Sequence, residues 1–220
     1  MVRIDSSGAK GQAAGAPAAY RSRVMTSAEA LQRLLDGNAR FAAGASQQQP
    51  DPTRLRELAE GQHPFATVLG CSDSRVPPEM VFDQGLGDVF VVRVAGNVVG
   101  TEILGSLGYA LEYLATPLFV VLGHEGCGAV QAALAKRRAG AITHGPLAEL
   151  IDAVSPALDD VDPHESTAAQ MRQAVEANVR HTVRRLADTP AGRDALARDR
   201  IQVVGAIYEL ATGRVRLLAE

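Results

Sequence analysis

Both cysteines of this 220-residue chain lie beside other side chains that can bind a metal ion. Asp73 follows Cys71 after one intervening residue, and Cys127 lies three residues after His124. Two thiolates and one imidazole, completed by a carboxylate or a water molecule, form the tetrahedral ligand set that suits zinc. Glycines on both sides of Cys127 would let its loop bend tightly around an ion. We therefore expect a zinc site, provided that the fold brings the two segments together.

Each of these segments follows a short apolar run that is rich in valine. The two runs cover residues 65–70 and 118–123, and a third run covers residues 89–94. Nearly continuous apolar runs of this kind are typical of strands buried on both faces of a parallel sheet. The carboxyl ends of such strands line the crevice in which an open α/β sheet binds its ligands. Both candidate metal-binding segments are thus predicted at the same edge of the sheet.

Helical patterns alternate with these strands, which predicts an α/β fold with right-handed crossovers. We expect a mostly parallel central sheet of four to five strands, flanked by helices and closed by a C-terminal antiparallel edge strand. An N-terminal helical arm is expected over residues 26–60, beginning at a capping box of Thr26 and Glu29. The other predicted elements are helices over 54–59, 101–115, 129–138 and 166–187, and a hairpin of strands over 201–210 and 214–218.

Length and composition favour a single domain, which we expect over residues 26–220 as the α/β unit that carries the zinc site, preceded by a flexible N-terminal segment, residues 1–25. The 22 Lys and Arg residues against 25 Asp and Glu give a net charge of −3, so no nucleic acid and no membrane surface is expected as a partner. Apolar runs stay short of the roughly 18 residues of a membrane-spanning helix. Two cysteines cannot form a disulfide framework, and we expect a cytoplasmic location.

Spacing alone leaves other interpretations of the cysteines open. A buried cysteine is often a small apolar filler of the core. A redox pair is less favoured, because redox motifs place their thiols closer together in sequence. A structural zinc site is the stronger alternative, and it would have four protein ligands.

The motifs around these residues are similar to those of a known family. Cys71-Ser72-Asp73-Ser74-Arg75-Val76-Pro77 and His124-x-x-Cys127-Gly128 resemble the signature of the β-class carbonic anhydrases, and Arg93-Val94-Ala95-Gly96-Asn97 resembles a third family stretch. The similarity is close over residues 62–138 and looser over 26–218. It implies reversible hydration of carbon dioxide to bicarbonate and a proton, one Zn²⁺ per subunit, and assembly into a homodimer or homotetramer.

The resemblance also implies a role for each matching residue. Cys71, His124 and Cys127 would bind the metal, and zinc-bound hydroxide would attack carbon dioxide. Asp73 and Arg75 would form a catalytic dyad that orients this hydroxide, with Asp73 becoming a fourth zinc ligand only in a closed form. The residues implied in substrate binding, some of them across a dimer interface, are Gln62, Phe90, Ala95, Tyr109 and Gly128.

One subgroup of the family is inhibited by bicarbonate in a pocket that uses Trp, Arg and Tyr. Arg93 and Tyr208 match two of these positions, but Val68 occupies the Trp position, so we expect the bicarbonate switch to be weak or absent. The remaining histidines are expected at the surface: His63, His144, His164 and His181.

Two alternative functions stay open at this point. One is a zinc enzyme of the same fold that hydrolyses carbonyl sulfide or carbon disulfide. The other is a non-catalytic, zinc-stabilised scaffold protein, which would not require the Asp73 and Arg75 pair or Gln62.

Overall fold

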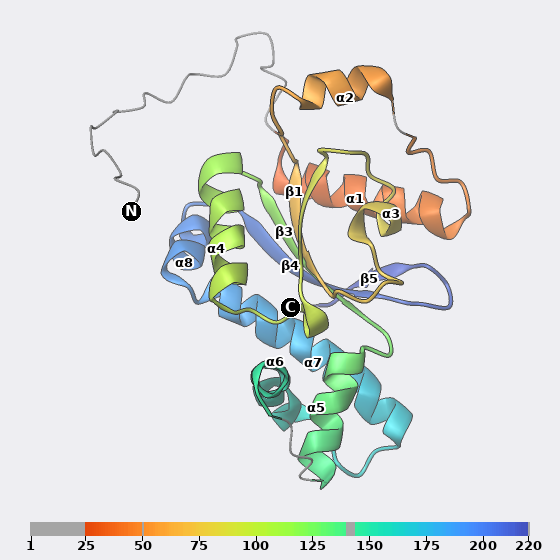
Figure 1. Ribbon diagram of the computed structural model, residues 1–220, viewed down its shortest axis with the longest axis vertical. Helices are drawn as coiled ribbons and strands as arrows, with labels where there is room; N and C mark the ends of the chain where they lie inside the picture. The colour runs from red at the N-terminus through yellow and green to blue at the C-terminus, as the bar shows by residue number, and fades with distance from the viewer. Residues whose placement is uncertain (1–24, 50, 140–143, 220) are drawn as a thin grey trace, which may run out of the picture.

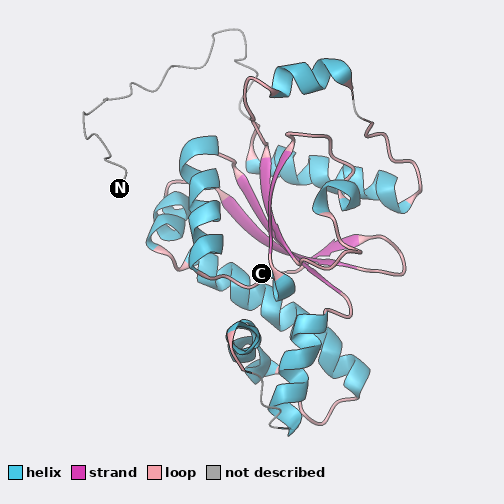
Figure 2. Cartoon of the chain, viewed as in Figure 1, coloured by secondary structure: helices cyan, strands magenta, loops and turns pink. Residues whose placement is uncertain are grey.

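The computed structural model describes residues 25–49, 51–139 and 144–219, so nearly all of the predicted flexible segment lies outside the described residues. The described chain forms an α/β fold around one five-stranded sheet (Figures 1 and 2). The strand order is β2-β1-β3-β4-β5; β5 runs antiparallel to β4, and the other neighbouring strands are parallel. This confirms the predicted architecture. The strands are β1 (Ala66–Gly70), β2 (Val89–Arg93), β3 (Leu118–His124), β4 (Gln202–Tyr208) and β5 (Val215–Leu217).

The central strands β1 and β3 are buried along their whole length, as continuous apolar runs require in a sheet covered on both faces. The register pairs Gly70 of β1 with Arg93 of β2 and with Leu122 of β3. Three parallel strands therefore end at nearly the same level, and the residues that follow them share one edge of the sheet.

Two hydrophobic clusters cover the two faces of the sheet. On one face, α1 (Ser27–Ala42) and α3 (Pro78–Val81) pack on strand residues such as Val68 and Val120. On the other face, Leu69 and Val121 belong to the cluster that is formed with most of the remaining helical elements. These elements are α4 (Thr101–Tyr109), the π-helical η3 (Ala110–Leu114), α5 (Gly128–Ala139), α6 (Pro146–Val154), the 3₁₀ turn η4 (Ser155–Asp160), α7 (Thr167–Ala187) and α8 (Pro190–Ala197).

The N-terminal arm consists of two helices in different settings. The predicted capping box at Thr26 is present and starts α1, whose residues Ala30 and Leu34 are fully buried against the sheet. Helix α2 (Pro52–Leu58) extends away from the sheet, and its residues are exposed or half-buried (Figure 1). In the part of the chain that the structure describes, no helix is both long and apolar enough to cross a bilayer.

Some elements differ from the prediction. The segment 101–115 is an α-helix only to Tyr109; it then widens into a π-helical turn and ends at Ala115, which adopts a left-handed conformation with φ of 51°. Helices α3, α6 and α8 were not predicted. Each is short and has proline in its first turn, so an apolar period has too few residues in which to show itself.

Candidate active site

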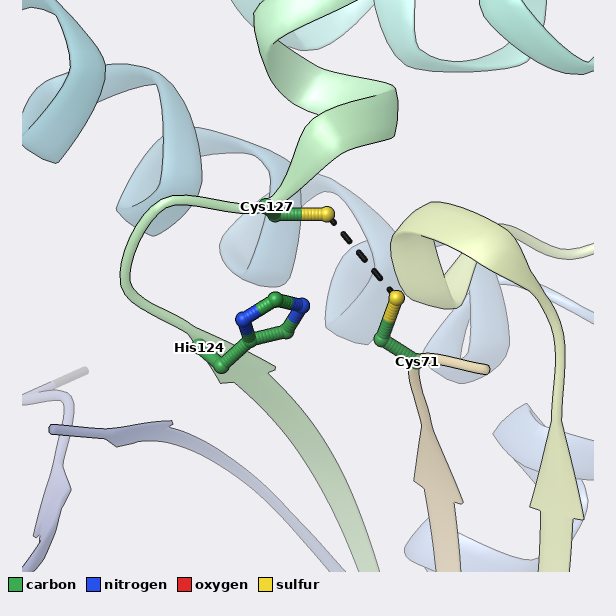
Figure 3. Close-up of side chains that lie close together, drawn as sticks. All are labelled: Cys71, His124 and Cys127. Carbon is green, nitrogen blue, oxygen red and sulfur yellow. Dashed lines mark hydrogen bonds between the residues drawn. The ribbon is translucent and has the colours of Figure 1, made fainter. Parts of the chain in front are cut away.

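Three potential metal ligands meet at the carboxyl edge of the sheet (Figure 3). Cys71 follows β1, His124 is the last residue of β3, and Cys127 lies directly before α5. One ligand atom from each residue lies within 4.8 Å of the other two. The sequence prediction that two distant loops converge here agrees with this geometry.

The geometry of this group fits a tetrahedral zinc ion. The two Sγ atoms are 3.9 Å apart, close to the roughly 3.8 Å expected when two thiolates bind one zinc at about 2.3 Å. The Nδ1 atom of His124 lies 2.9 Å from the carbonyl oxygen of Glu125. Because a carbonyl can only accept, Nδ1 carries the proton and Nε2 keeps its lone pair. This Nε2 atom is buried and has no hydrogen-bond partner among the described residues, as expected of a metal ligand.

The environment of the sulfur atoms favours a thiolate. All three side chains of the group are at most 4% exposed. The hydrogen bond between the two thiols lowers the pKa of Cys71, against the effect of burial, and the hydrogen bond from the Gly96 N–H lowers it further. The pKa of Cys127 is raised by the same pairing and by burial. The pair thus carries one negative charge with a shared proton, and a cation could replace that proton.

An ion pair lies next to these ligands. Both Asp73 carboxylate oxygens accept hydrogen bonds from the Arg75 guanidinium, at 2.9 Å from Nε and 2.8 Å from a terminal nitrogen. The backbone N–H of Arg75 adds a third bond of 3.0 Å. These hydrogen bonds hold the pKa of Asp73 far below its usual range, so its carboxylate is ionised at neutral pH. Its Oδ2 lies 3.8 Å from Nε2 of His124, so the charge lies beside the candidate metal-binding group of Cys71, His124 and Cys127.

Arg93 fastens the loop that carries Cys71 and Asp73. Its guanidinium donates to the carbonyl oxygens of Cys71, at 2.9 Å, and of Asp73, at 2.6 Å. Tyr208, at the end of β4, is buried beside His124 in the sheet register. Arg93 and Tyr208, which match the Arg and Tyr of the subgroup's bicarbonate pocket, therefore border the site. The fully buried Val68 stands at the position of that pocket's Trp.

The substrate-binding residues implied by the resemblance fall into two groups. Ala95 and Gly128 lie at the carboxyl edge, next to residues that contact or bear the site sulfurs. Phe90 does not lie at this edge. It pairs with Thr67, which comes four residues before Cys71, so Phe90 lies about 13 Å along the strand direction from the level of Cys71. The Tyr109 ring lies beside Phe90, with centroids 6.1 Å apart, and the exposed Gln62 precedes β1. Gln62, Phe90 and Tyr109 therefore lie away from the candidate metal-binding group of their own chain.

The other histidines lie away from this group. As expected, His63, His144 and His164 are exposed, whereas His181 is half-buried on α7. Burial and the charges of Arg185 and Arg184 lower the pKa of His181, so it is neutral at pH 7.

The sequence analysis missed the polar side chains of α7 that reach toward the site. Asn178, Thr182 and Arg185 donate hydrogen bonds to the segment between β2 and α4. The sequence does carry a signal for them. They occupy positions i, i+4 and i+7 of a predicted helix, so they share one face, and the positions beside them are apolar and predicted to be buried.

Comparisons with known proteins agree with this geometry. The family model described as carbonic anhydrase matches residues 66–215. Carbonic anhydrase 2 of Mycobacterium tuberculosis is 40% identical over 190 residues, which cover 86% of this chain and 91% of that protein.

Solved structures show the same relationship. The structure of a β-carbonic anhydrase of Aspergillus fumigatus superposes with a TM-score of 0.70 at 30% identity, covering 86% of this chain and 92% of that one. A structure from work on two tetrameric β-carbonic anhydrases of Sordaria macrospora also reaches 0.70, at 26% identity, with 86% and 96% covered. The chain therefore belongs to the β-class carbonic anhydrases, a family of enzymes that hydrate carbon dioxide.

Proposed function

We propose that this chain catalyses the reversible hydration of carbon dioxide to bicarbonate and a proton, using one zinc ion held by Cys71, His124 and Cys127. The observation that carries the proposal is the geometry of the three side chains. They are buried, their sulfurs are spaced as on a tetrahedral zinc, and Nε2 of the histidine has no partner among the described residues. A catalytic zinc needs three protein ligands and one position for water.

Zinc supplies a Lewis acid that lowers the pKa of a water molecule, so that hydroxide is available near neutral pH. Two thiolates donate more charge to the metal than neutral imidazoles do, so the protein must itself favour and orient the reactive oxygen. Asp73 is suited to this task. As a carboxylate it can only accept a hydrogen bond, so the proton of the attacking oxygen points to Asp73 and a lone pair is left to face carbon dioxide.

Arg75 keeps Asp73 in this role. Its two parallel N–H bonds orient the carboxylate and keep it ionised. With both oxygens engaged by Arg75, Asp73 is not drawn to the metal, so the arrangement corresponds to the open form of the site rather than the closed one.

We further propose that a second copy of the chain completes the substrate cleft with Gln62, Phe90 and Tyr109. The support is that these residues lie far from the metal-binding group of their own chain, and that Tyr109 is 44% exposed. The Sordaria macrospora enzymes, which share this fold, are described as tetrameric. We infer a homodimer or a homotetramer.

The test is stopped-flow hydration of carbon dioxide by purified protein of known zinc content, with carbonyl sulfide and carbon disulfide as alternative substrates. We expect rapid carbon dioxide hydration that scales with zinc content and is lost on chelation. Faster turnover of a sulfur substrate would make the chain a hydrolase of that compound. Stoichiometric zinc with no turnover of any of the three would identify a zinc-stabilised scaffold instead.

A further inference from the structure

The segment between β2 and α4 lies against one of the site sulfurs. Within it, the 3₁₀ turn η2 (Ala95–Asn97) places the backbone N–H of Gly96 3.3 Å from Sγ of Cys71, where it donates a hydrogen bond. Gly96 adopts a left-handed conformation with φ of 71°, and a Cβ there would lie 3.1 Å from Cβ of Ala129. Glycine is therefore the residue that lets this N–H reach the sulfur without strain or crowding.

Helix α7 holds this segment from the opposite side. The Nδ2 atom of Asn178 donates to the carbonyl of Gly96 at 2.8 Å, and the Thr182 hydroxyl donates to the carbonyl of Asn97 at 3.3 Å. Both side chains are 1% exposed. Gly96 is thus held between two elements, with its carbonyl on Asn178 and its N–H on Cys71.

The hydrogen bonding of Asn178 indicates what its amide is for. Its Oδ1 atom is buried without a hydrogen-bond partner among the described residues, while its Nδ2 makes the short bond to Gly96. An unpaired buried acceptor is unfavourable, so this side chain is poorly explained by packing alone. Its donor is the part that is used, and that donor acts on Gly96, whose N–H reaches the sulfur of Cys71.

We propose that Asn178 is a positioning residue for the metal centre: by holding the Gly96 carbonyl, it keeps the Gly96 N–H on the Cys71 sulfur. This rests on the proposed binding of zinc by Cys71. A hydrogen bond to a thiolate withdraws charge that the sulfur would otherwise donate to the metal. With two thiolates in the ligand set, such a bond preserves the acidity of the metal and with it the reactivity of the site.

The test compares two variants of the full-length protein after replacement of zinc by Co²⁺. Asn178→Leu removes the donor to Gly96, and Thr182→Val removes the neighbouring donor to Asn97. Each leaves one backbone carbonyl without its side-chain donor, so both should lower the melting temperature by a similar amount. The readout is the sulfur-to-cobalt charge-transfer band, which moves to lower energy when a thiolate becomes richer in charge.

We expect this band to shift to lower energy in Asn178→Leu and to stay at the wild-type position in Thr182→Val. If the leucine variant does not fold, Asn178→Ser replaces it, because the shorter side chain cannot reach Gly96 and should give the same shift. In the wild type loaded with ¹¹³Cd, the Gly96 amide proton should show a scalar coupling to the metal through the hydrogen bond.

Equal band positions in Asn178→Leu and wild type would overturn the positioning role while leaving the proposed function intact. Absence of the ¹¹³Cd coupling in a metal-loaded wild type would also overturn it. Failure of the wild type to bind either metal would overturn the proposed function, and this inference with it.

Discussion

Two aspartate–arginine pairs in this chain illustrate two different uses of the same interaction. Asp73 and Arg75 are two residues apart on the loop after β1, and 53% of the Arg75 side chain is exposed. Asp83 and Arg40 are 43 residues apart and join the end of α3 to α1, with Asp83 only 2% exposed. The first pair borders the metal-binding group, whereas the second lies inside the fold.

The difference lies in what else each carboxylate contacts. Among the described residues, the Asp73 carboxylate accepts hydrogen bonds from Arg75 alone, and its Oδ2 lies 3.8 Å from Nε2 of His124. Asp83 also accepts from the backbone N–H groups of Gln47 and Gln48, and so fixes the chain that leaves α1. Burial opposes ionisation of Asp83, but these bonds and Arg40 outweigh it and lower its pKa. A depressed pKa therefore occurs both in a structural carboxylate and in the carboxylate that we propose to be catalytic, and their locations distinguish them.

The largest effect is expected from Asp73→Asn. The amide keeps the size of the side chain but is no longer a carboxylate that only accepts hydrogen bonds. We expect the hydration rate to fall by at least about 100-fold, with zinc content and melting temperature close to wild type. Stopped-flow assays with a pH indicator measure the rate. Near wild-type activity in Asp73→Asn would show that the Asp73 carboxylate is not needed for the reaction.

Arg75→Lys should have a smaller effect on the same rate. Lysine keeps the charge but cannot form two parallel bonds to a carboxylate, so Asp73 would be held less firmly. We expect a loss on the order of 10-fold, since the pairing of charge persists while the orientation is relaxed. Zinc analysis serves as the control, because metal content should not change. A loss as large as that of Asp73→Asn would mean that Arg75 does more than orient its partner.

Asp83→Asn should change stability rather than rate. It removes the acceptor of Arg40 and weakens the bonds to two backbone N–H groups, so we expect the free energy of unfolding to fall by about 2 kcal/mol. Urea unfolding measures this change, and the hydration rate per folded molecule should match wild type. A strong loss of the hydration rate in folded Asp83→Asn would contradict the assignment of a purely structural role to the Asp83–Arg40 pair.

The smallest expected effect is a change with pH in the difference in unfolding free energy between wild type and Asp83→Asn. Because the folded-state pKa of Asp83 lies below the ~3.9 of an unfolded chain, its stabilisation is complete above that value and is lost as the pH falls through the folded-state pKa. The gap between wild type and Asp83→Asn should be constant from about pH 8 to about pH 5 and narrow only at more acidic pH. Narrowing near neutral pH would contradict the depressed pKa.

The sheet and the convergence of Cys71, His124 and Cys127 were predictable because both depend on strong local signals. Valine-rich runs such as 65–70 and 118–123 marked the buried strands, and the parallel arrangement then placed Cys71 and His124 at one edge. The short helices α3, α6 and α8 lack such a signal, because fewer than ten residues hardly show a period. The π-helical turn after Tyr109 has no signature in the sequence.

The surroundings of the site were less predictable than its ligands. The contact between Asn178 and Gly96 joins residues 82 apart, and nothing local to either one indicates it. The proposed role of Phe90 is a similar case. The sequence pattern alone would assign Phe90 to the core, and only the resemblance to a family connects it with the substrate cleft that we propose between two chains.

The most direct test of the account is zinc X-ray absorption spectroscopy on the purified protein. Cys71, His124 and Cys127 predict one zinc per chain with two sulfur ligands at about 2.3 Å and two nitrogen or oxygen ligands at about 2.0–2.1 Å. Substoichiometric zinc, or a shell without exactly two sulfur atoms, would contradict the proposed metal centre and the function built on it.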